Sequence, residues 1–215
     1  MDLKKYILEE VKPQHSSAVL GQRRFQKGEY IYMPPTKPNE VFQMVSGVVK
    51  IGSYTIDGDE VCYDFLFRQE VFGNLSYLNG QFFEFAKAVT DCELTTYDLS
   101  FYKKIIVHDH LVSEWFNRMV VSRWCKVETK LFKICTLSPM DRILSLFQEM
   151  DQKIEDSNGK FIHLPSLMTD LEISQLTGLT RQTVAKLLKS YQRVHGMPLF
   201  KTKKIKSLNN QSLQK

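Results

Sequence analysis

The chain has 215 residues, of which 43% are hydrophobic and 25% are charged, a composition typical of a globular protein with room for one large domain or two modest ones. No apolar run approaches ~18 residues and the charged N-terminus lacks the apolar core of a secretory signal, so neither a membrane-spanning helix nor secretion is expected. The four cysteines are scattered without a C-x-x-C pair, which fits a cytoplasmic protein with reduced thiols better than a disulfide framework or a zinc site.

The net charge of +5 is unevenly distributed along the chain. No acidic residue follows Glu172, whereas nine of the 29 basic residues do. The preceding part therefore carries 20 basic residues against all 24 acidic ones. A negative body with a basic C-terminal end predicts a module that binds a polyanion such as nucleic acid.

The N-terminal half predicts a small β-structure. Residues 2–12 favour a short amphipathic helix that ends at Pro13. Over residues 22–99, short β-prone runs alternate with glycine-containing turns, which is typical of a sandwich or barrel-like roll. The Asp57-Gly58 pair between two such runs predicts a hairpin with a two-residue turn.

A long helix is predicted over about residues 107–136. Five of its apolar residues recur at the 4-3-4-3 spacing of a helix that pairs with another helix: Val120, Trp124, Val127, Leu131 and Ile134. Phe116 and Met119 widen this stripe, so the helix could also pack on its own barrel. We expect a dimer seam here, with packing on the chain's own barrel as a compatible alternative.

The C-terminal part predicts a helix-turn-helix. Ser138-Pro139 begins one helix, and the capping pair Thr169 and Glu172 begins another. Gly178 can end that second helix because glycine tolerates the left-handed conformation of a sharp turn. A third helix then has a buried face made of Val184, Leu187, Leu188 and Tyr191. Two helices joined by a glycine turn are the arrangement that places a recognition helix in a DNA major groove.

The outer face of that last helix favours DNA binding over two helices that pack in some other domain. Arg181, Gln182, Lys186 and Lys189 point away from its apolar stripe, and all are residue types that contact base edges or phosphates. Residues 197–208 predict a hairpin beside it, a wing with Lys201, Lys203 and Lys204 at its tip.

The order of roll, long helix and winged helix-turn-helix resembles the Crp/Fnr family of bacterial transcription regulators over nearly the whole chain. In the roll the resemblance rests on Phe25-x-x-Gly28-x-x-Ile31, Phe42-x-x-Val45-x-Gly47-x-Val49-Lys50 and Asp57-Gly58. Near the C-terminus, Thr180-Arg181-Gln182-Thr183-Val184-Ala185-Lys186 is similar to the family's Ser-Arg-Glu-Thr-Val-x-Arg recognition helix.

The resemblance implies an α+β fold in three parts. These are a jelly-roll-like sensor β-roll of the cyclic-nucleotide-binding type over residues 1–106, a dimerisation helix over 107–137 and a winged helix-turn-helix over 138–215. It further implies a cytoplasmic homodimer that binds inverted repeats in double-stranded DNA and works with RNA polymerase, without a membrane partner.

The resemblance also assigns DNA contacts residue by residue. Arg181, Gln182 and Lys186 would contact the bases, and the backbone contacts would come from Thr180, Thr183, Lys189, Lys201, Lys203 and Lys204. Gln182 replaces the family's glutamate. Because glutamine suits adenine whereas glutamate accepts a bond from cytosine, we expect a shifted preference at one base pair.

The ligand cassette departs from the cyclic-nucleotide-binding pattern. The family's Gly-Glu-Leu and Arg-Ser-Ala correspond here to Gly73, Asn74, Leu75, Glu84, Phe85 and Ala86. Glu84 stands where an arginine would pair with the cyclic phosphate, so a carboxylate would face a ligand of the same charge. Gln69 likewise replaces a glycine that is usual in the family.

We therefore expect no cyclic-nucleotide binding and no resident cofactor. The N-terminal cysteine cluster of the family's oxygen-sensing branch is missing, so an iron–sulfur centre is not expected. The alternative is a roll that senses another small molecule and allows DNA binding only when that molecule is bound.

An enzyme is the remaining alternative. His108, His110 and Glu114 superficially match a metal cluster, and a barrel could be that of a cupin. These residues fall at the start of the long helix rather than on inward-facing strands, so we expect neither a metal nor catalysis. Cys62, Cys92, Cys125 and Cys135 could respond to redox conditions, but buried structural cysteines are expected instead.

Overall fold

The computed structural model describes residues 1–12, 20–36, 38–77 and 83–196 and divides into two compact units. The first unit comprises residues 1–126 and 154–161, and the second comprises 127–153 and 162–215. The domain boundaries predicted from the sequence, at residues 106 and 137, separate parts by their expected function. The two units of the structure are separated by their internal packing instead, so the boundaries differ. The long helix and one hairpin are consequently shared between the two.

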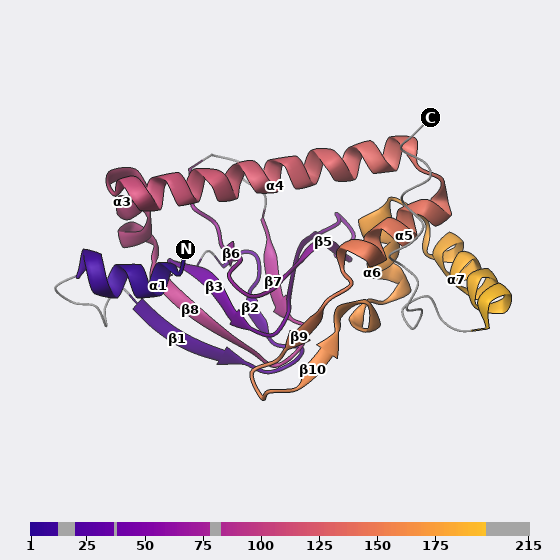
Figure 1. Cartoon of the computed structure of the whole chain (residues 1–215), viewed down its shortest axis with the longest axis horizontal. Coiled ribbons are helices and arrows are strands. Elements are labelled where there is room, and N and C mark those ends of the chain that lie inside the picture. The colour runs from indigo at the N-terminus through magenta and orange to yellow at the C-terminus, as the bar shows by residue number, and fades with distance from the viewer. Residues whose placement is uncertain (13–19, 37, 78–82, 197–215) are drawn as a thin grey trace. The chain divides into compact units, whose positions relative to one another are not determined.

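A roll of two four-stranded antiparallel sheets forms the body of the first unit, as predicted (Figure 1). The strand orders are β1-β8-β3-β6 and β2-β7-β4-β5. The strands are β1 (Leu20–Phe25), β2 (Tyr30–Tyr32), β3 (Glu40–Ser46), β4 (Val49–Tyr54), β5 (Glu60–Leu66), β6 (Val71–Phe72), β7 (Phe85–Ala88) and β8 (Cys92–Asp98). Of these only β6 was not predicted, because two residues give no alternation to recognise.

The core of the roll follows from the alternation of side chains along the strands. Alternate residues of β3 and β4, together with Leu94 of β8, enter one buried cluster that both sheets share. Within it the rings of Tyr32, Phe42 and Phe72 lie with their centroids 5.4 to 6.2 Å apart. Aromatic contacts of this kind stabilise a core beyond the area that they bury.

The predicted β4–β5 hairpin is confirmed, but its loop has three residues rather than two. The amide of Thr55 donates to the carbonyl of Asp59 at 2.9 Å, and the amide of Gly58 donates back to the carbonyl of Thr55 at 3.1 Å. Gly58 has φ +89°, the left-handed conformation that closes a three-residue hairpin loop. The Asp57-Gly58 pair therefore predicted the hairpin correctly, but the predicted loop length was wrong.

In the described residues before the long helix, two helical segments occur. Residues Leu3–Tyr6 form α1, which continues as the π-helical segment Ile7–Val11. Helix α3 (Leu99–His108) was not predicted; the Asp98 side chain begins it by accepting the amide of Phe101 at 2.8 Å. The long helix α4 (His110–Thr136) starts three residues later than expected, because Asp109 ends α3 and its carboxylate accepts the amide of Val112 at 2.9 Å.

The apolar stripe of α4 is divided between two environments. Val112 is fully buried, and Phe116 and Met119 pack against the same cluster, so packing on the chain's own barrel is confirmed for this half. Farther along, Val120, Val127 and Leu131 are 43%, 67% and 61% exposed. Trp124 is 64% exposed as well. The second half of the stripe is thus open to solvent in the single chain.

The cysteine expectation is half correct. Cys62 and Cys92 are buried in the roll, and burial raises the pKa of the Cys92 thiol to about 12. Cys125 and Cys135 are exposed instead, because they lie on α4 outside the face that packs on the roll.

The second unit contains the remaining helices. Its elements are α5 (Pro139–Glu149), the base of the hairpin β9 (Lys153–Glu155) and β10 (Phe161–His163), a 3-10 turn (Leu164–Leu167), α6 (Asp170–Thr177) and α7 (Arg181–His195). Ser138 caps α5 as predicted, with its hydroxyl accepting the amide of Asp141 at 3.3 Å. Ile143 and Phe147 are buried on the predicted inner face of α5. None of the helices in the described part of the chain is long and apolar enough to cross a membrane.

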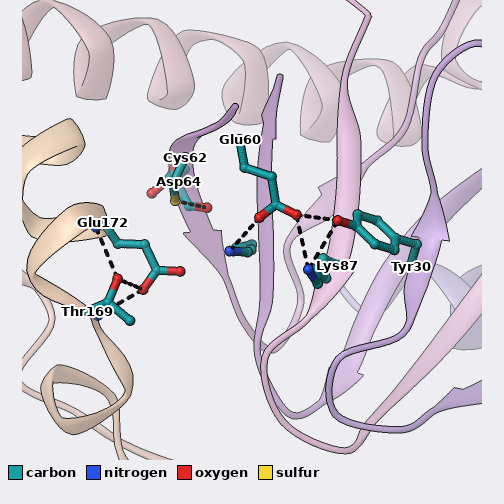
Figure 2. A network of polar contacts seen from close by, with 8 residues as sticks. Tyr30, Glu60, Cys62, Asp64, Lys87, Thr169 and Glu172 are labelled. Carbon is teal, nitrogen blue, oxygen red and sulfur yellow. Dashed lines mark hydrogen bonds and ion pairs between the residues drawn. The ribbon is translucent and has the colours of Figure 1, made fainter. Parts of the chain in front are cut away.

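A charged network lies on the sheet β2-β7-β4-β5 (Figure 2). Lys50 of β4 and Lys87 of β7 are directly opposite in register, an arrangement that would repel without an anion between them. Glu60 supplies that anion, with each lysine 3.0 Å from its carboxylate. Burial opposes the ionisation of Glu60, but the hydrogen bond from Tyr30 and the contacts with Lys50 and Lys87 outweigh it and lower its pKa to about 2.

This network predicts a pH-dependent part of the stability. Because the pKa of Glu60 is lower in the folded chain than its ordinary 4.5, its contribution is complete above about pH 5 and is lost as the pH falls toward 2. At neutral pH, Glu60→Gln should lower the free energy of unfolding by roughly 2 kcal/mol. The difference between the two proteins, measured by urea unfolding across this range, should shrink on acidification. A difference that stays constant with pH would contradict the role of the carboxylate.

Candidate nucleic-acid interface

Helix α6 begins with the predicted capping box. The hydroxyl of Thr169 accepts the amide of Glu172 at 3.2 Å, and the Glu172 carboxylate accepts the amide of Thr169 at 2.9 Å (Figure 2). These reciprocal bonds satisfy two backbone donors that the first turn of a helix leaves free. They also explain how Glu172, the last acidic residue of the chain, is accommodated at 8% exposure.

The turn between the two helices depends on Gly178. Its φ is +66°, and its amide donates to the carbonyl of Ser174. A Cβ atom at this position would lie 3.3 Å from the Cδ1 atom of Ile134 on α4. Glycine is therefore favoured here by its backbone conformation and by the close approach of α4. Ile134, predicted for the dimer seam, is half-buried next to this turn within its own chain.

Helix α7 follows as the predicted second helix. Thr180 caps it by accepting the amide of Thr183 at 3.1 Å. Val184 is fully buried, and Leu187, Leu188 and Tyr191 are partly buried, so the predicted inner face is confirmed. The arrangement α6–turn–α7 is that of a helix-turn-helix.

The outer face of α7 carries the predicted DNA-contacting side chains. Arg181, Gln182, Lys186 and Lys189 are all exposed and share this face, whereas Thr183 is partly buried and has its hydroxyl 2.8 Å from that of Thr180. With no acidic residue between residues 173 and 196, this face of the helix carries no negative charge. Such a face can bond to base edges and phosphates. Lys201, Lys203 and Lys204 of the predicted wing lie outside the described residues.

The ligand-cassette positions lie in the roll of the first unit. The side chain of Asn74 accepts the amide of Ser76 at 2.7 Å, which shapes the turn after Gly73, and Leu75 packs against the cluster beneath α4. Phe85 is fully buried against the rings of Tyr30 and Tyr54, while Ala86 enters the core between the sheets. A bulky ring therefore replaces the family's small hydroxyl residue at this position.

Glu84 reverses the polarity expected of a phosphate site. Its carboxylate accepts a hydrogen bond from the hydroxyl of Tyr32. Burial raises the pKa of Glu84, partly opposed by the Tyr32 bond and by the positive charge of Arg123. An ionised carboxylate here would repel an anionic ligand.

Arg123 of α4 is a residue of this region that the sequence did not indicate. One guanidinium nitrogen donates to the carbonyl of Val71 at 3.3 Å, and its charge affects the pKa of Glu84, Tyr32 and Glu70. It falls outside the apolar stripe of α4 and outside the cassette motif, so only the packing of α4 on the roll brings it close.

Gln69 is another departure from the family pattern, and its backbone conformation shows why glycine is usual there. It has φ +73°, a conformation in which glycine carries no steric penalty. The glycine usual at this position thus matches a backbone requirement that the chain still meets with glutamine.

The metal alternative gains no support. His108 ends α3 and His110 begins α4, so the helix break at Asp109 separates them. Among the described residues no group of three or more histidine, cysteine or acidic side chains is arranged to hold a metal ion.

Comparison with known proteins identifies the class of the first unit. Residues 22–109 match the cyclic nucleotide-binding domain family. The chain is 23% identical over 189 residues to a CRP-like cAMP-activated global transcriptional regulator of Mycobacterium tuberculosis, covering 86% of this chain and 84% of that one. It is 26% identical over 170 residues to the global nitrogen regulator of Synechococcus elongatus, covering 77% and 76%. Both relatives are regulators, which supports the interpretation that the chain is not an enzyme.

A solved structure shares the fold of the chain. A Crp/Fnr-family transcriptional regulator from Thermus thermophilus superposes with a TM-score of 0.63 at 17% identity, covering 81% of this chain and 87% of that one. The fold class predicted from the sequence is therefore confirmed. The chain thus contains a match to the cyclic nucleotide-binding domain and shares the fold of this solved regulator.

The two left-handed glycines of this region allow a matched test. Gly178→Ala should lower the free energy of unfolding by about 2 kcal/mol, since it adds a contact with Ile134 to the ~1 kcal/mol or more of left-handed strain. Gly196 ends α7 with φ +70° and open space around its Cβ position, so Gly196→Ala should cost the strain alone. Urea unfolding of both variants measures the difference. Equal losses would show that the approach of Ile134 carries no energy.

Proposed function

We propose that the protein is a sequence-specific DNA-binding transcription regulator of the Crp/Fnr type, acting in the cytoplasm as a homodimer on inverted-repeat sites together with RNA polymerase. The observation that carries this proposal is the outer face of α7, where four exposed cationic or amide side chains stand on a helix that a capped turn holds in place. The regulator relatives support the same interpretation.

The proposed assignment of base contacts and phosphate contacts follows from the chemistry of the side chains. Arg181, Gln182 and Lys186 meet base edges, and Gln182 favours adenine where the family's glutamate would favour cytosine. Thr180, Thr183 and Lys189 bind phosphates near the N-terminus and flank of α7, and Lys201, Lys203 and Lys204 add contacts beyond the described residues. The base contacts give specificity, whereas the phosphate contacts give affinity for any sequence.

DNA binding by purified protein tests this assignment. Arg181→Ala should weaken binding to the selected site by 10- to 100-fold and leave non-specific binding almost unchanged. Lys189→Ala should weaken binding to all sequences alike and reduce the slope of log affinity against log salt by about 1. Arg118→Ala changes an exposed arginine of α4 that pairs with Glu114 and serves as the control. Equal losses on specific and random DNA for Arg181→Ala would contradict a base-reading role.

The homodimer is supported by the exposed half of the α4 stripe. Val120, Trp124, Val127 and Leu131 repeat at heptad spacing, and a single chain leaves them open to solvent. A second α4 would cover them, with Ile134 at the end of the seam. Two parallel copies would set the spacing of two recognition helices at about 34 Å, one turn of DNA.

A charged residue in this seam should separate the subunits. Val127→Asp places a carboxylate in the apolar contact and should raise the dimer dissociation constant by 100-fold or more. Ser122→Asp adds the same charge on an exposed position of the same helix outside the stripe. Sedimentation velocity over a concentration series compares the two. A Val127→Asp dimer as tight as the Ser122→Asp dimer would exclude this seam.

We further propose that the regulator does not respond to cyclic AMP and holds no cofactor. Three observations support this proposal. Glu84 stands in the place of a phosphate-binding arginine, Phe85 is buried against two tyrosines, and the side chain of Asn74 accepts a hydrogen bond within its own turn. The second possibility is a roll that binds a different small molecule and thereby permits DNA binding. Selection of genomic fragments by ligand-free protein separates these, because an enriched inverted repeat would show that no effector is needed.

Calorimetry tests the cyclic-nucleotide proposal directly. Titration of the wild-type protein with cyclic AMP up to about 1 mM should give no binding heat, because a buried carboxylate facing a phosphate costs several kcal/mol. A dissociation constant in the micromolar range would overturn the proposal.

A further inference from the structure

The chain passes between its two compact units three times. Helix α4 crosses at residues 126 and 127, β9 crosses at 153 and 154, and β10 crosses at 161 and 162. The tip of the β9–β10 hairpin therefore belongs to the roll, whereas its base belongs to the unit that holds the helix-turn-helix. Two units that move independently need only one connection. The two additional crossings, both in the β9–β10 hairpin, therefore need a structural explanation.

Three hydrogen bonds hold the hairpin tip within the roll unit, and a fourth orients the carboxylate that accepts one of them. The amide of Gly47 in the β3–β4 turn donates to the carbonyl of Glu155 at 2.9 Å. The amide of Ser157 donates to the carbonyl of Asp91 at 3.1 Å, and the side-chain amide of Asn158 donates to the Asp91 carboxylate at 2.6 Å. The same carboxylate accepts the amide of Lys27 at 2.8 Å through its other oxygen. We call the contacts among Gly47, Asp91, Glu155, Ser157 and Asn158 the hairpin clasp.

Hydrogen bonds within the hairpin tip also hold its own conformation. The buried carboxylate of Asp156 accepts the amides of Asn158 and Lys160 at 2.9 Å each, and the amide of Gly159 donates to the carbonyl of Asp156 at 3.1 Å. Ile154 is 8% exposed. A tip held by internal hydrogen bonds restricts the strands attached to it, whereas a flexible loop of the same length would leave them free to move.

Gly47 is adapted to this contact. Its φ is +85°, and a Cβ atom there would lie 2.5 Å from the carbonyl oxygen of Asp91. Only glycine lets the β3–β4 turn approach the β7–β8 turn this closely while its amide faces the hairpin. The two turns that hold the clasp are thus fixed against each other by the core of the roll.

We propose that the hairpin clasp is a second coupling element, alongside α4, which positions the DNA-binding unit for the roll. Asp91 and Asn158 are positioning residues in this scheme; they act through the hairpin and contact no DNA. Formation of the clasp ties β9 and β10 to the roll, which restricts the orientations open to the unit that carries α7. Fewer orientations mean a smaller entropic loss when two recognition helices engage one DNA site.

Three variants of unchanged net charge test the clasp, beginning with hydrogen exchange of the full-length protein. Asn158→Ala removes the side-chain bond, and the amides of Gly47 and Ser157 should then exchange about 10-fold faster. Ser157→Ala keeps its main-chain donor and should exchange like the wild type. The reciprocal double change Asp91→Asn with Asn158→Asp exchanges donor and acceptor while still accepting the amide of Lys27, and should restore protection.

DNA affinity is the second readout, and this part rests on the proposed function. Asn158→Ala should weaken binding to the selected site about 5-fold or more, Ser157→Ala should leave it unchanged, and the reciprocal pair should restore it. If wild-type protein binds no DNA, the proposed function fails while hydrogen exchange still measures the clasp.

Two outcomes would overturn the inference. Unchanged exchange at Gly47 and Ser157 in Asn158→Ala would show that the clasp does not hold the hairpin. Faster exchange together with unchanged or tighter DNA binding would show that the clasp forms but does not position the DNA-binding unit.

Discussion

The packing of the first half of α4 on the β-roll is the interaction on which the rest of the structure depends. Val112 is fully buried there, and Phe116 and Met119 cover the cluster formed by α1, α3 and the adjacent strands. The helix is continuous to Thr136, so it also carries the exposed apolar residues of the stripe beyond this contact. In the proposed homodimer, the exposed half of this helix would contact the second subunit.

The roll has kept the architecture of a cyclic nucleotide-binding domain while changing the chemistry of its cassette. Glu84 brings a negative charge where a phosphate ligand needs a positive one, and the positive charge of Arg123 on α4 favours its ionised form. The pKa of Glu84 is raised although Arg123 and Tyr32 oppose the effect, so keeping this half-buried carboxylate ionised costs stability.

Much of this protein could be predicted from local patterns. Strand alternation, the capping box at Thr169, the turn glycine Gly178 and the apolar face of α7 depend on neighbours within a few residues, and each was confirmed. Errors arose where a local signal was short or ambiguous. Two-residue β6 shows no alternation, and α3 was hidden because its β-prone residues continue the run of β8.

The sequence by itself determined the succession of roll, long helix and helix-turn-helix, the basic end and the polar face of α7, because charge and periodicity depend on adjacent residues. Only the tertiary structure decided which half of the α4 stripe is buried, that Arg123 lies near Glu84, and that Asp91 bonds to Asn158. These last two pairs are separated by 39 and 67 positions along the chain. Contacts at such separations depend on how the strands and helices pack, which no local pattern specifies.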